Sequence, residues 1–368
     1  MAPVTAPHPL PGFARSTVDG YAVRAADTYG VSEGLPGYLE VAGAVQMGAE
    51  PDVTVGPGTV AVMPTGGVLP PGADAVVMVE YTQEAMPGTI EVTRPVAPGE
   101  GVVRADEDAA TGDELAPAGR PLRAQDLGML AAAGVTEVSV HARPRVTVFS
   151  TGDEVVPPET AELRPGQVRD ATATALGALI AQAGGVARQG GIIPDDRAAL
   201  EAALRGALPG SDMIVISAGS SVGARDETAA AVARLGPPGI WCHGLAVRPG
   251  KPTLLAECAG APVVGLPGNP RSALVVFRLI GMPLVWRVGG CTSPPAEPVV
   301  RARLARDVAS AAGRLDVIQV RLEDGLAAPL FGLSALLSIL TAADGYVVVP
   351  EEATGLGAGT DVDVTLYR

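Results

Sequence analysis

The feature that most constrains the fold is a change of pattern at Arg145. From there to about residue 291, short apolar runs rich in Val and Ile alternate with segments that have helical spacing. Such alternation predicts βαβ units and a parallel sheet. Sheets of this kind bind ligands at the carboxyl ends of their strands. We therefore predict an α/β domain over residues 143–291, with its site at that edge.

The elements expected in this domain follow from the spacing of apolar residues. The expected strands are 145–150, 186–193, 213–217, 253–257 and 263–266, and the expected helices are 171–183, 196–208, 226–235 and one from Pro270 onward. Asp195 is expected to cap the second helix, because a short acid before a periodic run is a helix-start signal.

The segments on either side of this domain are rich in β patterns. Residues 13–98 alternate short β-branched runs (38–45, 58–63, 75–80, 89–92) with Gly/Pro turns, which predicts an inserted β domain. Residues 123–133 have helical spacing and are followed by an expected strand at 137–141. Residues 292–368 return to short β runs and predict a small β-barrel. The expected fold class is thus multidomain α/β plus β, with residues 1–12 and 99–142 as a linking and dimerisation part.

The charge balance excludes two classes of partner. With 26 basic and 40 acidic residues the net charge is −14, whereas nucleic acid and anionic membranes need a basic face. The three cysteines are odd in number and lack metal-ligand spacing, so buried reduced thiols in a cytoplasmic protein are expected. The first residues have no secretory pattern. The longest apolar stretch, near 272–288, is broken by two Arg and a Pro, so no membrane span is expected.

Two residue types occur once each. Of the 26 basic residues only Lys251 is a lysine, and the only asparagine is Asn269. Both fall in Gly/Pro-rich loops. One explanation is that the two residues were retained by chance. The alternative is that Arg cannot replace the lysine, and Asp or Ser cannot replace the asparagine, without loss of function.

Four loops follow the predicted strands. The first, Ser150–Glu154, carries carboxylates that could hold Mg²⁺ or fix a hydroxyl, or could simply form a solvated turn. The second runs between a strand and a helix and is built from small residues, which suits an anion because backbone N–H groups and the helix dipole face it. Its candidate residues are Ser217, Gly219, Ser221 and Gly223, with Asp226 just beyond.

The third loop, Arg248–Pro252, places two cations on a turn stiffened by proline. Arg offers a planar fork, whereas Lys is a compact point charge better suited to a transferred oxyanion. In the fourth loop, Asn269 tolerates φ > 0 and Pro270 suits the first position of a helix whose N-terminus faces the ligand. The candidate residues of the fourth loop are Pro267, Gly268, Asn269, Pro270 and Ser272.

Motifs in the first hundred residues are weak alone; Asp19-Gly20, for example, could be a hairpin turn. Taken in order, however, the motifs resemble those of the bacterial molybdopterin molybdenumtransferases and the C-terminal domain of gephyrin over nearly the whole chain. The motifs that carry the resemblance are VDGYAV, MPTGGVLPPGADAVV, DED (106–108), FSTGDEVV, IIPDD, VISAGSSVG, RPGKP, GLPGNPRSA and ADGYVVVPE.

The resemblance implies a four-part homodimer whose site lies between the α/β domain of one subunit and the β insert of its partner. Adenylylated molybdopterin would bind there with molybdate, and Mg²⁺-dependent cleavage would release AMP. By resemblance, the catalytic residues are Asp19, Thr65, Asp108, Glu154, Asp195, Asp226 and Lys251, with Glu154 and Asp226 on the metal. The substrate would be bound by Arg248 and by the candidate residues of the second and fourth loops, which are Ser217, Gly219, Ser221, Gly223, Pro267, Gly268, Asn269, Pro270 and Ser272.

The sequence also departs from the family. The usual N-terminal helix is nearly absent, which bears on dimer strength, and Ala218 and Ala171-Thr172 replace a Gly and a Ser-Asn pair. Two alternatives therefore stay open: a non-catalytic pterin-binding or scaffolding homologue, and a molybdopterin adenylyltransferase, against which the flanking β domains count. That adenylyltransferase is also a possible partner. The sequence does not choose between molybdate and tungstate.

Overall fold

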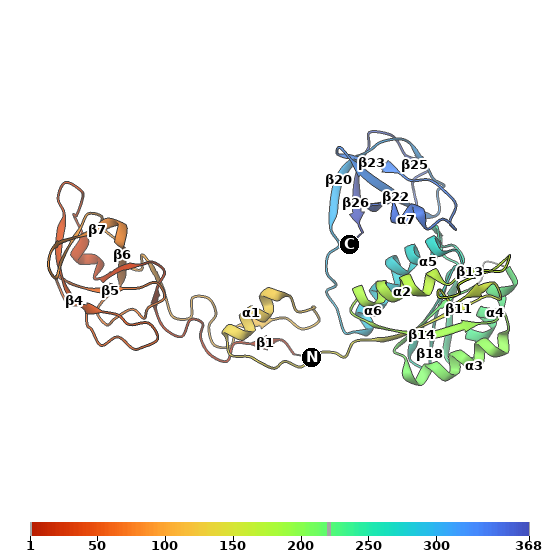
Figure 1. Ribbon diagram of the computed structural model, residues 1–368, viewed down its shortest axis with the longest axis horizontal. Coiled ribbons are helices and arrows are strands. Elements are labelled where there is room, and N and C mark those ends of the chain that lie inside the picture. Colours follow the sequence, from red (N-terminus) through yellow and green to blue (C-terminus); the bar gives the residue numbers. More distant parts are fainter. Residues whose placement is uncertain (1, 219–221, 368) are drawn as a thin grey trace. The chain divides into compact units, whose positions relative to one another are not determined.

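A computed structural model describes residues 2–218 and 222–367, apart from the side chains of 222–226. The chain divides into two compact units, one made of the chain up to Ala118 with Leu122–Ser139, the other of Gly119–Pro121 and the chain from Val140 onward (Figure 1). The first unit is mainly β and the second combines an α/β domain with a barrel. The predicted class, multidomain α/β plus β, is confirmed.

Most of the first unit is a six-stranded sheet with the order β6-β3-β5-β4-β8-β7. Its strands are β3 (Gly20–Val23), β4 (Gly37–Ala44), β5 (Thr59–Met63), β6 (Ala75–Met78), β7 (Thr82–Met86) and β8 (Thr89–Val92). Short 3₁₀ turns, η1 (Ala25–Thr28) and η2 (Val79–Tyr81), connect them. Alternate residues such as Val60, Val77 and Ile90 form its core, as expected for strands with one buried face.

A smaller part of the first unit pairs β1 (Val4–Thr5) with β10 (Glu114–Ala116) and β2 (Arg15–Ser16) with β9 (Val102–Val103), beside α1 (Ala124–Ala132). The predicted helix at 123–133 is confirmed. The strand predicted at 137–141 is wrong, since no strand forms there. Its apolar residue Val138 instead packs against the cluster of Leu115 and Leu130, so the alternating pattern reflects packing rather than strand pairing.

The α/β domain is built on a six-stranded sheet with the order β14-β11-β15-β19-β18-β16. Its strands are β11 (Arg145–Thr151), β14 (Val186–Ile193), β15 (Met213–Ser217), β16 (Pro238–His243), β18 (Leu254–Cys258) and β19 (Ala261–Leu266). The helices are α2 (Ala171–Gln182), α3 (Arg197–Ala207), extended by η3 (Leu208–Gly210), α4 (Val222–Val232), α5 (Pro270–Val276) and α6 (Met282–Val288), the last two joined by the π turn η4 (Phe277–Gly281).

Helices cover both faces of this sheet (Figure 1). Met213 and Val215 of β15 pack with residues of α2, α5 and α6, whereas Ile214 and Ile216 pack with residues of α3 and α4. Because successive residues of a strand point to opposite faces, a strand between two helix layers must be apolar throughout. That is why the strand segments read as continuous apolar runs.

The sheet is not wholly parallel, which corrects the sequence analysis. β14, β11, β15 and β19 are parallel, but β18 runs antiparallel to β19, and β16 runs antiparallel to β18. Only Ala259 and Gly260 connect β18 to β19, with φ of 51° and 83°. Two residues with positive φ make a tight hairpin turn, and a parallel pair would need a crossover of a dozen residues or more.

The predicted cap of α3 is wrong by one residue. Asp196, not Asp195, caps the helix, since its carboxylate accepts a hydrogen bond of 2.7 Å from the N–H of Ala199. Asp195 is left outside the helix, beside the loop after β11.

The last part of the chain closes into the predicted barrel. Its strands are β20 (Val299–Leu304), β22 (Leu315–Glu323), β23 (Leu326–Pro329), β24 (Gly345–Val349) and β26 (Asp361–Leu366), in the order β22-β23-β20-β26-β24 with β24 returning to β22. A two-residue strand, β17 (Val247–Arg248), adds to β22 in parallel. This pairing ties the barrel to the loop that carries Arg248 and Lys251.

The remaining elements are short: β12 (Val155–Val156) with β13 (Val168–Arg169), β21 (Val308–Ala309) with β25 (Gly355–Leu356), and α7 (Ser338–Thr341). Over the residues that the structure describes, no helix is both long enough and apolar enough to cross a membrane.

Candidate functional site

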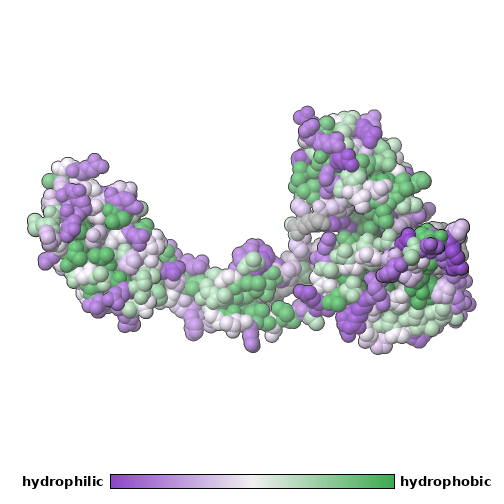
Figure 2. Space-filling model, viewed as in Figure 1, coloured by the Kyte–Doolittle hydropathy of each residue, from purple (hydrophilic) through white to green (hydrophobic). Residues whose placement is uncertain are grey.

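The four predicted loops meet at one edge of the α/β sheet. Ser150 at the end of β11 lies beside Ser217 at the end of β15, and Ser217 lies beside Leu266 at the end of β19. Leu254, the first residue of β18, pairs with Gly265. The loop 248–252 therefore reaches the same edge from the start of an antiparallel strand, not from the end of a parallel one. Figure 2 shows hydrophilic residues gathered at the end of the domain near β13 and α4.

Three carboxylates gather where β11 and β14 end. Asp153 accepts a hydrogen bond of 3.2 Å from the N–H of Asp195. Partial burial, and then the charges of Glu154 and Asp153, raise the pKa of Asp195 above its usual range. The structure thus brings the predicted residues Glu154 and Asp195 together, and adds Asp153. Carboxylates that repel one another favour a bound cation or proton.

Gly152 allows the Glu154 side chain to fold back at this place. Its φ is 138°, and a Cβ there would lie 2.6 Å from the Glu154 Oε2 atom. Any other residue would be strained and would displace the carboxylate. Gly152 is therefore needed for the Glu154 carboxylate to take this position.

The second loop begins at Ser217, which is buried, as is its neighbour Ser150. The Oγ of Ser150 has no hydrogen-bond partner in the described part of the chain. Gly219 and Ser221 lie outside the described residues. Gly223 and Asp226 fall in α4, within the stretch whose side chains are not described. Among the described residues, no group of three or more His, Cys, Asp or Glu is arranged to hold a metal, so Glu154 and Asp226 stay a prediction as a metal pair.

The basic loop has a fixed backbone and an exposed lysine. Gly250 has φ of 129°, and a Cβ there would lie 2.2 Å from Val276 of α5. The N–H and the hydroxyl of Thr253 both donate to the Gly250 carbonyl. Lys251 is exposed, and its side chain makes no hydrogen bond or ion pair with the residues that the structure describes. The predicted cation is therefore available to a ligand.

Arg248 is held from the barrel. Its Nη1 lies 3.6 Å from the Oδ2 of Asp316, a carboxylate only 1% exposed, while 63% of the Arg248 side chain is exposed. Arg314 binds the same carboxylate, with its Nε 2.8 Å from Oδ1. One buried negative charge thus faces two guanidinium groups. Buried charges are stable only when paired, so Asp316 fixes the direction of Arg248.

The fourth loop leads into α5. Pro270 takes the first helical position, as predicted. Asn269 is of a residue type that tolerates positive φ, but here its φ is −69° and it is the residue that precedes the helix. Its Nδ2 donates a hydrogen bond of 2.9 Å to the Oγ of Ser334 in the barrel. The single asparagine therefore links two domains. Ser272 and Pro267 are buried, whereas Gly268 is partly exposed.

Three candidates lie in the first unit. Asp19 accepts a hydrogen bond of 2.7 Å from the N–H of Thr65, and bonds from that N–H and from the Thr65 hydroxyl lower the Asp19 pKa. The hairpin alternative for Asp19-Gly20 is wrong, because β3 pairs with β5 and β6. A Cβ at Gly20 would lie 1.9 Å from the Val77 carbonyl oxygen, so glycine is required there. Asp108 is exposed.

Sequence reasoning missed three residues near this edge: Asp316, Ser334 and Arg271. Asp316 could have been noticed in the sequence, because it is an acid at the start of an apolar strand, where an unpaired charge is costly. Nothing in the sequence distinguishes Ser334 from other serines. Arg271 lies inside a loop that was singled out, but its surroundings depend on how the barrel packs against α5.

Comparison with known protein families matches most of the chain in three segments. Residues 1–134 match the model of the MoeA N-terminal region (domain I and II), 147–287 match a probable molybdopterin binding domain, and 301–367 match the MoeA C-terminal region (domain IV).

Among individual proteins, the molybdopterin molybdenumtransferase of Nostoc sp. is 34% identical over 98% of this chain and 84% of its own length. Molybdopterin molybdenumtransferase 2 of Mycobacterium tuberculosis is also 34% identical, over 98% of this chain and 90% of its own. A solved structure of the molybdopterin biosynthesis MoeA protein from Pyrococcus horikoshii is 38% identical, with a TM-score of 0.80, and covers 100% of this chain and 90% of that one.

Proposed function

The chain belongs to the molybdopterin molybdenumtransferase family, and from that premise we propose that it is a transferase that inserts molybdate into adenylylated molybdopterin with release of AMP. One observation supports this most: Lys251, an exposed cation with no acid partner among the described residues, lies at the same sheet edge as a cluster of acids. A phosphate ester and an oxyanion need the cations, and a metal that neutralises the leaving phosphate needs the acids.

We propose that carboxylates at this edge of the sheet hold Mg²⁺, with Glu154 after β11 and Asp226 of α4 as its ligands. The donor set fits, since Mg²⁺ takes hard oxygen ligands and often only one or two protein carboxylates. The raised pKa of Asp195 supports the same conclusion, because crowded negative charge is what a divalent cation relieves. Bound there, the ion would stabilise negative charge on the departing phosphate.

On the cationic side, we propose that Lys251 handles molybdate and Arg248 supports it. The Lys251 ammonium projects from a backbone fixed by Gly250 and Thr253. Arg248 is held in direction by Asp316. The buried hydroxyls of Ser217 and Ser272 and the turn Pro267–Pro270 would line the space for the pterin nucleotide, together with Gly219, Ser221 and Gly223.

We further propose that the active form is a homodimer. Asp19, Thr65 and Asp108 belong to the first unit, whereas the acids and cations above belong to the second, and the family's arrangement completes each site from two subunits. We propose four domains: a linking part of residues 1–12 with 99–142, a β domain of residues 13–98, an α/β domain of residues 143–291 and a barrel of residues 292–368. We also propose that the protein is cytoplasmic. Light scattering should report a dimer at micromolar concentration; a monomer at high micromolar concentration would count heavily against a shared site.

The decisive experiment is reconstitution of the purified protein with adenylylated molybdopterin, molybdate and Mg²⁺, following AMP. AMP release that requires both molybdate and Mg²⁺ is expected. Tight binding of the pterin nucleotide without AMP release would identify the non-catalytic homologue. Formation of the adenylylated pterin from ATP would identify the sister adenylyltransferase activity.

A further inference from the structure

Arg271, the second residue of α5, is a cation without a counter-charge. It is partly buried, and its Nε atom is enclosed with no hydrogen-bond partner in the described part of the chain. No ion pair joins its guanidinium group to any described carboxylate. A buried or half-buried charge normally has such a partner, so the local structure does not explain this residue.

Arg271 also lies close enough to Arg248 to feel its charge. Burial lowers the pKa of Arg271, and the charge of Arg248 lowers it further, with Tyr367 acting in the opposite direction. The carboxylate nearest to Arg248 is that of Asp316, which Arg314 already binds in two contacts of 2.8 and 3.3 Å. Positive charge therefore exceeds negative charge here, although the chain as a whole carries −14.

Arg278, two turns further along the same continuous helix, provides a direct contrast. Its Nε is also buried without a partner. Its Nη2, however, lies 2.8 Å from a carboxylate oxygen of Glu297 and donates to the Leu366 carbonyl. Arg278 is thus neutralised within the protein, and only Arg271 is left to find its anion elsewhere.

We propose that Arg271 is a further substrate-binding residue of this edge, which together with Arg248 grips a tetrahedral oxyanion. The two Nη groups of a guanidinium can give parallel hydrogen bonds to such an anion, and the enclosed Nε of Arg271 has no counter-charge among the described residues to compete with it. The anion is either molybdate or the phosphate of the nucleotide. This assignment rests on the proposed function for the identity of the ligand, but the excess of positive charge at Arg271 and Arg248 does not.

The test compares Arg271→Gln with Arg271→Lys and with the matched control Arg278→Gln, all in the full-length protein. Binding of molybdate alone, inorganic phosphate alone and AMP alone is measured by calorimetry, and thermal unfolding is measured without ligand. Arg271→Gln should weaken binding of at least one anion by about tenfold, as expected for one lost charge-assisted bond, without lowering Tm, since it relieves repulsion. Arg271→Lys should lose less. Arg278→Gln should lower Tm and leave anion binding unchanged.

The anion that is affected identifies the ligand: a loss confined to molybdate assigns Arg271 to the metal oxyanion, and a loss for AMP and phosphate assigns it to the nucleotide. Equal anion binding by wild type and Arg271→Gln would overturn the inference, as would a wild type that binds none of the three. Weakened binding in Arg271→Gln with no AMP release by any form would leave the inference standing and refute the proposed function alone.

Discussion

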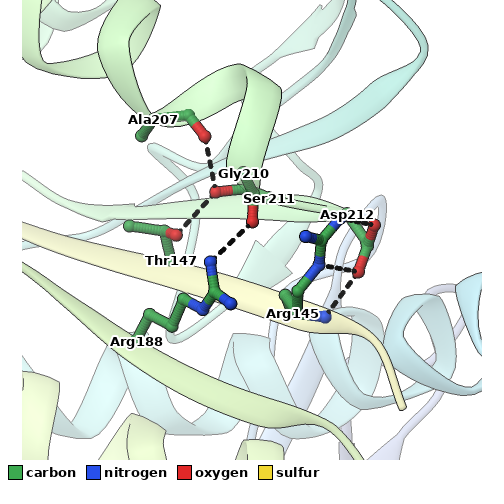
Figure 3. Close-up of polar contacts among 7 residues, drawn as sticks. All are labelled: Arg145, Thr147, Arg188, Ala207, Gly210, Ser211 and Asp212. Atoms are coloured by element: carbon green, nitrogen blue, oxygen red, sulfur yellow. Dashed lines mark hydrogen bonds and ion pairs between the residues drawn. The ribbon is translucent and has the colours of Figure 1, made fainter. Parts of the chain in front are cut away.

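The two edges of the α/β sheet are built in opposite ways, although the same strands begin at one and end at the other. At the amino edge, Arg145 donates from Nε and Nη2 to Asp212, and the Ser211 hydroxyl bonds both Thr147 and the Ala207 carbonyl (Figure 3). Arg188 donates to the Gly210 carbonyl. Each of these side chains has its partner within the protein.

At the carboxyl edge several polar groups lack such partners. The Ser150 Oγ and the Arg271 Nε have none among the described residues, and Asp195 lies among like charges. The two edges therefore shift carboxyl pKa values in opposite directions. The hydrogen bonds from Arg145 lower the pKa of Asp212, whereas burial and neighbouring carboxylates raise the pKa of Asp195. Unsatisfied and mutually repelling groups that gather at one edge are typical of a ligand site. The comparison thus predicts stability effects at one edge and activity effects at the other.

The largest effect should come from Glu154→Gln at the carboxyl edge. Loss of this charge should lower AMP release by about 100-fold or more, about 2.7 kcal/mol in the barrier. The amide keeps the shape that packs against Gly152, so Tm should not fall. Single-turnover AMP release and thermal unfolding measure the two quantities. Normal turnover by this variant would show that the loop after β11 has no catalytic role.

Next in size is Lys251→Arg, which keeps the charge but exchanges a compact ammonium for a wide planar fork that would displace a small tetrahedral anion. It should bind the pterin nucleotide almost normally and raise the molybdate requirement by roughly tenfold, about 1.4 kcal/mol. Arg248→Lys is the matched exchange and should cost much less, because it keeps a cation at 248 and leaves the compact ammonium of Lys251 in place. Molybdate titrations of AMP release compare the two, and equal wild-type curves would make the lone lysine an accident of composition.

Much of this contrast was predictable from sequence. The apolar runs of β11, β15 and β19 predicted parallel strands, and the carboxyl ends of parallel strands place the loops at Glu154, Ser217 and Asn269 along one edge. The antiparallel turn at Ala259-Gly260 was readable in principle but was overlooked, since the domain pattern favoured parallel strands. The strand expected at 137–141 failed because alternation records burial, whether or not a partner strand lies alongside.

The charges around Arg248 were not predictable. They depend on the pairing of β17 with β22, two segments nearly seventy residues apart in sequence, which brings Asp316 against Arg248 and the barrel against α5. No local pattern encodes such a contact. For the same reason Arg271 looked like one arginine among 25, until its lack of a partner could be seen.

At the amino edge, Asp212→Asn should act on stability alone. The pair with Arg145 is about 40% exposed, so its loss should cost about 1 kcal/mol, not more. Because the folded pKa of Asp212 is below its unfolded value, the stabilisation is complete above about pH 4 and disappears as pH falls through the folded pKa. Urea unfolding should separate variant and wild type at pH 7 and not in strong acid. A change in the molybdate requirement would contradict the division between the edges.

The smallest effect, and the one of opposite sign, should come from Asp195→Asn. Its folded pKa is above the unfolded value, so the ionised carboxyl lowers stability above the folded pKa, and this penalty is relieved as pH falls through that pKa. The variant should therefore be slightly more stable than wild type at pH 7, and the difference should vanish in acid. Because Asp195 is exposed and water screens its neighbours, the gain should be at most a few tenths of a kcal/mol. Thermal unfolding across pH measures it, alongside AMP release, which should fall. A loss of stability at pH 7 would instead mean that Asp195 holds the fold together, as Asp212 does, and that the carboxyl edge is not built at the expense of stability.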